Sequence, residues 1–214
     1  NEINSFFLDQ REKSKKTWSG SGQELRSNFF LKLKEDFNPT KFTGYKSNIS
    51  NSKVLALIYN EKFMQKVKSQ KKVSVIFEST PFYAESGGQV GDTGFIKKNN
   101  QNIFKVVDTK KFDGDIYVHY LENLGENELI VDLNYDLEIN VERRKNITNN
   151  HSATHLLHES LRRVLGKHVN QKGSLVAQKK LRFDFTSPKG LDDNEIKKVE
   201  KIVNKSIREN LRLE

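Results

Sequence analysis

The period of the hydrophobic pattern changes twice along this chain, and this change constrains the fold more than any other feature of the sequence. Between residues 42 and 142 the apolar residues form short runs, which clusters of Gly, Asn and Asp separate. The runs that we expect to be strands are 54–59, 73–77, 103–107, 116–121 and 137–141. Several short strands with turn residues between them predict a small barrel or a sandwich.

The segment before these strands carries a helical pattern. Residues 2–17 read as a polar helix, and the two glycines within 18–22 break it. A second helix is expected over 23–37, where an apolar residue recurs every four positions, at Leu25, Phe29, Leu33 and Phe37. The pair Asn38–Pro39 ends it, because the residue before proline avoids the helical conformation.

The segment after the strands returns to helical spacing and mixes it with alternation. Residues 149–165 read as an amphipathic helix, and the stretches 175–176 and 181–185 read as strands. Asp192 followed three residues later by Glu195 predicts the capped start of a closing helix. We therefore predict an α+β fold in three parts: a helical segment over 1–41, a small β-barrel over 42–142, and over 143–214 an antiparallel sheet with helices.

The charge of the chain is divided along the same lines. The formal net charge is +9. It is the sum of +8 for residues 1–72 (15 basic, 7 acidic), −8 for 73–142 (5 basic, 13 acidic) and +9 for 143–214 (17 basic, 8 acidic). Basic ends around an acidic middle suit a polyanionic partner. A Lys- and Asn-rich composition with solvated lysines explains the same numbers.

Composition also excludes several classes of protein. There is no Cys, which excludes a disulfide framework and a thiol nucleophile. The longest apolar run, 54–59, is far too short to span a bilayer, and we expect no membrane partner. The N-terminus has no signal-peptide pattern and no initiator Met, so we expect a cytoplasmic protein of which this sequence begins midway.

The sharpest chemical signal is the stretch 150–158, which reads NHSATHLLH. On a helix that turns about 100° per residue, four of its polar side chains share an arc of about 100°. These four are His151, Thr154, His155 and His158. Leucines lie beside the arc, so the helix can pack on them and present imidazoles to a cleft.

Two histidines four residues apart on a helix can bind one zinc ion, because their imidazoles project side by side. The residue after His151 is Ser, so the general base of a metalloprotease is absent. Exposed or hydrogen-bonded histidines are the competing interpretation. No Cys can complete a four-ligand site within this chain.

Two further stretches offer turns with polar groups. Residues 80–94 read TPFYAESGGQVGDTG, in which four glycines allow tight turns and close backbone approach. The Gly-Lys-Ser/Thr ending of a nucleotide-binding loop is missing, so a turn between strands is the simpler interpretation. Residues 171–176 read QKGSLV, where Gln171 and Ser174 offer neutral hydrogen-bonding groups beside a glycine.

Taken together, these stretches resemble the alanyl-tRNA synthetase family. The resemblance rests on FYAESGGQVGDTG at 82–94, NHSATHLLH at 150–158, QKGSLV at 171–176 and LRFDF at 181–185, in the order and spacing of the family. The stretch WSGSG at 18–22 resembles the segment that precedes the editing domain in the full synthetase. The match covers nearly the whole chain.

The resemblance implies roles for four residues. His151 and His155 match two ligands of a zinc ion, whose other ligands we expect in a Cys-x-x-x-His motif downstream of Glu214. Thr154 and Gln171 match positions that line the editing pocket, and we treat them as the candidate catalytic residues. His158 matches the helix face and not a ligand. On this basis 1–41 is the tail of a tRNA-recognition region, 42–142 the barrel subdomain and 143–214 a zinc-dependent editing domain truncated at its C-terminus.

The activity that the resemblance implies is hydrolysis of Ser-tRNA(Ala) and Gly-tRNA(Ala), while an upstream domain carries the ATP-dependent alanylation. ATP would then bind only to that other domain. The partners would be tRNA(Ala), above all its aminoacylated 3′ end, and the rest of the parent synthetase. Two alternatives remain: a free-standing trans-editing deacylase, and a non-catalytic tRNA-binding module with a structural zinc ion.

Overall fold

The computed structural model describes residues 28–68 and 72–210. In this part of the chain a closed barrel is followed by one long helix, which packs with a two-stranded hairpin and a second helix. The expected helix 2–17, the break at 18–22 and Leu25 of the apolar stripe lie outside these residues. The elements, in chain order, are α2 (Asn28–Leu31), α3 (Leu33–Asp36), β1 (Lys41–Phe42), β2 (Ile49–Tyr59), β3 (Lys62–Met64), β4 (Lys66–Val67), β5 (Lys72–Phe77), β6 (Ser79–Thr80), β7 (Gly94–Lys98), β8 (Gln101–Phe112), β9 (Ile116–Asn123), β10 (Leu129–Ile130), β11 (Asn134–Ile139), α4 (Val141–Leu165), β12 (Gln171–Val176), β13 (Leu181–Phe185) and α5 (Asp193–Glu209).

Six antiparallel strands close the barrel in the order β11-β7-β8-β9-β5-β2, because β11 also pairs with β2. Side chains from all six strands fill the interior, with Leu57, Phe77, Phe104 and Leu137 fully buried. Alternation along each strand sends every second side chain inward, which explains why the pattern in the sequence has a period of two. The small barrel and the mixed helix–strand class that the sequence predicts are confirmed.

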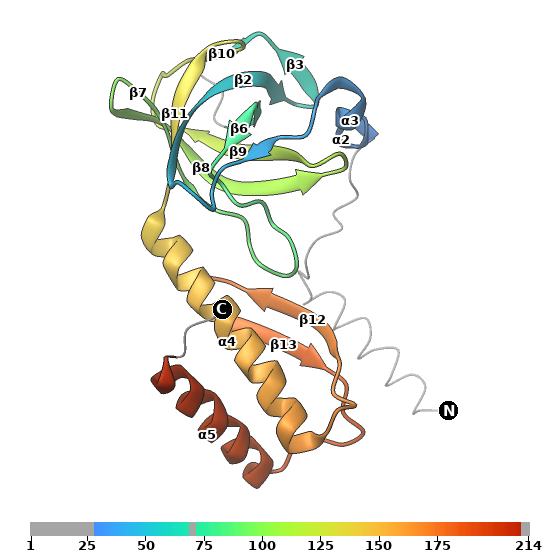
Figure 1. Cartoon of the computed structure of the whole chain (residues 1–214). Coiled ribbons are helices and arrows are strands. Elements are labelled where there is room, and N and C mark those ends of the chain that lie inside the picture. Colours follow the sequence, from blue (N-terminus) through green and yellow to red (C-terminus); the bar gives the residue numbers. More distant parts are fainter. Residues whose placement is uncertain (1–27, 69–71, 211–214) are drawn as a thin grey trace.

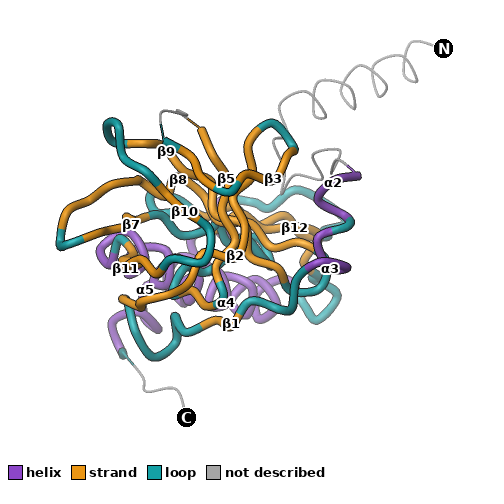
Figure 2. Tube along the Cα trace, turned by 90° about the horizontal axis from the view of Figure 1, so that it is seen from above, coloured by secondary structure: helices purple, strands orange, loops and turns teal. Residues whose placement is uncertain are grey.

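The two short helices lie at the side of the barrel, as Figure 2 shows from above. Leu33 is buried against the outer faces of β2, β5 and β9, and the Phe30 ring stacks on that of Phe112 with 4.8 Å between centroids. The described part of the helix expected over 23–37 is helical but not continuous, because α2 ends at Leu31 and α3 spans Leu33–Asp36.

Helix α4 leaves the barrel and lies between the β12–β13 hairpin and α5 (Figure 1). Its N-cap Asn140 accepts a hydrogen bond from the backbone N–H of Arg143 at 2.9 Å. The expected strand 137–141 therefore ends at Ile139, and the helix expected over 149–165 begins eight residues earlier, at Val141. A small core of Leu161, Val169 and Val199, with Phe183 and Phe185 of the hairpin packed against it, joins α4 to the hairpin and to α5.

None of the helices within residues 28–68 and 72–210 is long and apolar enough to cross a bilayer.

A buried histidine ties the barrel to the loop that follows β6. The Nδ1 of His119 lies 3.2 Å from the carbonyl oxygen of Val75, and its Nε2 lies 2.8 Å from the Thr80 hydroxyl. The same hydroxyl accepts the backbone N–H of Phe82 at 3.1 Å. A neutral imidazole satisfies this network, with Nδ1–H donating to the carbonyl and Nε2 accepting from the hydroxyl. Burial is the main cause that lowers the pKa of His119, to about 4.

This pKa makes the barrel sensitive to acid. Unfolded chains bind a proton at His119 below about pH 6.5, but the native state binds it only near the lowered pKa, so stability is complete above pH 6.5 and falls toward pH 4. We expect the residue to account for about 2 kcal/mol of lost unfolding free energy between pH 7 and pH 5. Urea unfolding of wild type and His119→Gln at both pH values measures it. Equal acid sensitivity of the two proteins would contradict the prediction.

Candidate active site

Two other segments of the chain come close to the middle of α4, and the three together form the candidate site. They are α4 itself, the hairpin β12–β13 and the loop between β6 and β7, which hangs from the barrel toward β12 in Figure 1. A pocket of about 60 Å³ lies where they meet. Its lining consists of Gly87, His151, Thr154, His155, His158, Gln171, Ser174, Val176 and Phe183. The structure thus brings together the candidate ligands His151 and His155 and the candidate catalytic residues Thr154 and Gln171. The roles of these four residues stay predictions.

The two candidate ligands lie one helical turn apart with their rings nearly parallel. The ring centroids of His151 and His155 are 5.2 Å apart and the planes differ by 11°. His151 is half-buried and His155 is exposed. Burial, and to a smaller extent the charge of His155, lowers the pKa of His151, which favours the neutral imidazole that ligates metals.

The pair fits two positions of a zinc site. The Nδ1 of His151 lies 2.6 Å from the Oε1 of Gln89, and a bond from Nδ1–H to this oxygen leaves Nε2 with its lone pair. A ligating histidine whose second nitrogen donates to an oxygen is the arrangement typical of zinc sites. Within residues 28–68 and 72–210, no group of three or more His, Cys, Asp or Glu side chains is placed to hold a metal ion. The described residues therefore offer two candidate ligands of the four that zinc prefers.

His158 forms part of the pocket wall. Its ring lies 5.0 Å from that of Phe183, and its Nε2 is 3.4 Å from the carbonyl oxygen of Val169. These contacts give the side chain a packing role beside the other two histidines.

The candidate catalytic residues lie on opposite walls of the same pocket. Thr154 is buried, and its hydroxyl donates to the Asn150 carbonyl oxygen at 2.8 Å, so its oxygen lone pairs are the groups available to a substrate. Gln171 is exposed, and one N–H of its amide donates to Ser174 Oγ at 3.2 Å. An amide has a second N–H and an acceptor oxygen, so Gln171 retains both kinds of hydrogen-bonding capacity.

The loop from the barrel reaches the pocket through a tight turn. Ser86 and Gln89 exchange two backbone hydrogen bonds, and Gly87 and Gly88 between them have φ of 59° and 84°. Two successive positive φ values are the requirement of a type I′ turn, which Gly meets without strain. The turn docks on β12, because Val176 N–H donates to the Gly88 carbonyl at 2.7 Å and Val90 N–H to that of Val176 at 3.1 Å.

Gln89 is the site residue that the sequence analysis missed. It is 4% exposed although its side chain is polar. The signal was present in the motif: a type I′ turn requires the two glycines but places no demand on the residue after them, so a glutamine there needs another explanation. Its partner lies 62 positions away, on α4.

A buried ion pair fixes the base of the loop to the first turn of α4. The Arg144 guanidinium donates to both carboxylate oxygens of Asp92 and to the carbonyl oxygens of Pro81 at 2.9 Å and Gly44 at 3.2 Å. Next to it, Arg143 donates to the Gly91 carbonyl at 2.8 Å. Burial lowers the pKa of Arg143, while the charges of Asp92 and Asp108 act in the opposite direction. Loop and helix are therefore oriented together.

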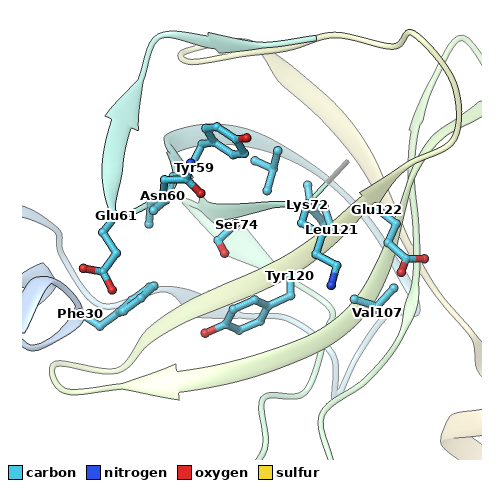
Figure 3. A pocket seen from close by; sticks show the side chains of 12 residues that line it. Phe30, Tyr59, Asn60, Glu61, Lys72, Ser74, Val107, Tyr120, Leu121 and Glu122 are labelled. Atoms are coloured by element: carbon cyan, nitrogen blue, oxygen red, sulfur yellow. The ribbon is translucent and has the colours of Figure 1, made fainter. Parts of the chain in front are cut away.

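A larger pocket, of about 460 Å³, lies on the barrel beside α2 (Figure 3). Apolar groups such as Ile58 and Val107 line it together with Lys72, Ser74 and Glu122. It shares no residue with the pocket on α4. Its walls contain none of the residues that the motifs of the sequence single out, so we do not assign the chemistry to it.

Known proteins resemble this chain over nearly all of its length. The family model of class II tRNA synthetases (A) matches residues 2–143. The alanine–tRNA ligase of Parvibaculum lavamentivorans is 43% identical over 201 residues, which are 94% of this chain and 22% of that protein. The alanine–tRNA ligase of Rickettsia bellii is 43% identical over 205 residues, which are 95% of this chain and 23% of that protein. The chain spans less than a quarter of the length of these relatives.

Proposed function

Because the chain belongs to the class II tRNA synthetase (A) family, we propose that it is the part of an alanine–tRNA ligase that hydrolyses Ser-tRNA(Ala) and Gly-tRNA(Ala). The observation that carries this proposal is the pocket that unites His151 and His155 with Thr154 and Gln171. Ligation of alanine with ATP belongs, in this proposal, to another domain of the parent protein. The division at 41/42 and 142/143, and action in the cytoplasm, are part of the same proposal.

The chemical need for such a site follows from the size of the amino acids. A pocket that accepts alanine cannot exclude glycine, and it rejects serine only weakly, because one small group is worth about 1–3 kcal/mol of discrimination. A second, hydrolytic site corrects the errors if it accepts serine or glycine esters and refuses alanine. The pocket on α4 is small, and Thr154, Gln171 and Ser174 line it with hydroxyl and amide groups, which suits a serine side chain.

Thr154 and Gln171 supply the discrimination in this proposal. The lone pairs of the Thr154 hydroxyl accept a hydrogen bond from the seryl hydroxyl or from the water that attacks the ester. Gln171 binds the same groups from the opposite wall. The seryl hydroxyl supplies a hydrogen bond that the methyl group of alanine does not, and such a bond contributes about 0.5–1.5 kcal/mol.

His151 and His155 would hold a zinc ion, whose remaining ligands we place downstream of Glu214. A bound zinc ion supplies Lewis-acid chemistry or positions the amino group and the tRNA terminus. The chain's own contribution is the orientation of the two imidazoles on α4 and the pocket around them.

The partner in this proposal is tRNA(Ala), bound through its aminoacylated 3′ end. Lys172, Lys179 and Lys180 are exposed in the β12–β13 hairpin, close in sequence to Gln171. Lysines in such positions neutralise phosphates and give salt-dependent affinity without sequence preference.

A deacylation assay on the whole protein tests the proposal. We expect hydrolysis of Ser-tRNA(Ala) and Gly-tRNA(Ala) but not of Ala-tRNA(Ala), and a loss of about 10-fold in seryl hydrolysis for Gln171→Leu, the equivalent of about one hydrogen bond. Gln101→Leu, an exposed glutamine on β8, is the matched control and should retain the full rate.

The result separates the proposal from its rivals. A wild-type protein that binds tRNA but releases no amino acid would identify a non-catalytic RNA-binding module instead. Unchanged deacylation by Gln171→Leu would remove Gln171 from the site.

A further inference from the structure

We propose that Gln89 is a positioning residue that fixes the tautomer and the ring orientation of His151. The inference deepens the proposed function and rests on it, because it concerns a ligand of the same site. The glycine-rich loop of the barrel then has a chemical role, because it places the Gln89 amide against His151 on α4.

The contact itself is short and shielded. Gln89 Oε1 lies 2.6 Å from His151 Nδ1, and the Gln89 residue is 4% exposed. A neutral imidazole has one protonated nitrogen and one free lone pair, and the partner of either nitrogen selects the tautomer. An amide oxygen facing Nδ1 stabilises the proton there and leaves the lone pair at Nε2.

Gln89 is held too firmly to be an incidental neighbour. Its backbone closes the turn with Ser86, and the residues on either side of it are bonded to Val176 of β12. Gly88 lies so close to Ser174 that a Cβ added there would be 2.2 Å from Ser174 Oγ. The amide therefore reaches α4 from a backbone that is fixed by its own turn and by β12.

His155, the second imidazole of the pair, has no such hydrogen bond within residues 28–68 and 72–210. Its ring stacks on that of His151, and it has no hydrogen-bond partner among the described residues. The loop thus acts on one histidine of the pair, and the effect of changing Gln89 should be confined to His151.

The tautomer is measured directly in the 214-residue chain without metal. Long-range nitrogen–proton NMR, at a pH well above the ordinary histidine pKa of about 6.5, reports which nitrogen of each imidazole carries the proton. We expect Nδ1–H for His151 in wild type and in Gln89→Glu, which keeps an acceptor. Gln89→Met, which has similar length but lacks the acceptor, should show a mixture of tautomers, and Gln101→Met should resemble wild type. A protonated Nε2 in wild type, or an unchanged tautomer in Gln89→Met, would overturn the inference.

Zinc affinity provides the second readout, in the whole synthetase that contains this segment. Loss of an oxygen that orients a ligating histidine weakens metal binding about 10- to 100-fold. We expect this loss for Gln89→Met and recovery in Gln89→Glu, measured by competition with a chelating dye. Equal affinity of wild type and Gln89→Met rejects the positioning role. A wild-type synthetase that binds no zinc contradicts the proposed function instead, and the NMR measurement then still decides the tautomer.

Discussion

Replacing Arg144 by methionine is expected to lower the free energy of unfolding by about 3–5 kcal/mol, the largest stability effect of any single substitution that we predict. The side chain of Arg144 is 15% exposed and that of its partner Asp92 only 2%. Methionine fills much of the volume but leaves the Asp92 carboxylate buried without its counter-charge, and this uncompensated charge dominates the loss. Urea unfolding monitored by circular dichroism measures the change.

Asp92 also connects the two ends of the glycine-rich loop to each other. One carboxylate oxygen also accepts the backbone N–H of Tyr83 at 2.7 Å, and the Asp92 N–H donates back to the Tyr83 carbonyl at 2.8 Å. The ion pair thus closes the base of the glycine-rich loop as well as joining it to α4. We expect the loss of stability to be accompanied by a loss of loop order.

The matched control is Arg163→Met, on the same helix. Arg163 pairs with Glu159 one turn away, and both side chains are largely exposed, at 63% and 56%. Pairs of this kind contribute about 0.3–0.5 kcal/mol. Adding Asp92→Asn to Arg144→Met removes the stranded charge and should recover part of the loss. If Arg144→Met were no more destabilising than Arg163→Met, the ion pair would not be what joins loop and helix.

Local signals predicted the elements whose boundaries depend on their own residues. The strand 181–185 alternates Leu181, Phe183 and Phe185 with polar residues, and β13 has the same bounds. The closing helix begins where expected, because Asp192 accepts the Glu195 N–H at 2.8 Å and Glu195 accepts that of Asp192 at 3.0 Å. A capping box is closed within four residues, so the sequence contains all of it.

Elements that depend on distant partners were predicted less well. The first two turns of α4 carry no clear apolar stripe, so their helical state depends on the Asn140 cap and on the contacts of Arg143 and Arg144 with the barrel loop. Strand β7 follows directly on the glycine-rich loop and was not predicted. It pairs with β8 and β11 and so connects them within the barrel. Neither set of contacts is local in sequence.

The residues of the candidate site also differ in whether the local sequence predicts their positions. Helical geometry alone places His151, Thr154, His155 and His158 on one face, because their spacing within α4 determines it. Nothing local places Gln171 opposite Thr154, and the resemblance to a family supplied that expectation. Gln89 was missed because its contact with His151 exists only once the barrel loop has docked on β12.

Replacing Gly88 by alanine is expected to lower the rate of Ser-tRNA(Ala) deacylation about 100-fold. Its φ of 84° is strained for any residue with a Cβ, at about 1–2 kcal/mol. An added Cβ would lie 2.2 Å from Ser174 Oγ and 2.5 Å from the Ser174 carbonyl oxygen, so loop and β12 must separate. Gln89 lies on the loop and Gln171 on β12, and a shift of about 1 Å in a catalytic group costs about 100-fold in rate.

Gly114→Ala separates this effect from a general loss of stability. Gly114 lies between β8 and β9 with φ of 77°, and an added Cβ would be 2.7 Å from Lys34 Cβ, so both variants carry backbone strain and a close contact. Both should lose a similar amount of unfolding free energy, because positive φ is unfavourable for alanine at either place. Only Gly88→Ala should lose deacylation, since only Gly88 touches β12 beside the pocket. Equal activity of the two variants, measured under conditions where both are folded, would show that the docked loop does not organise the site.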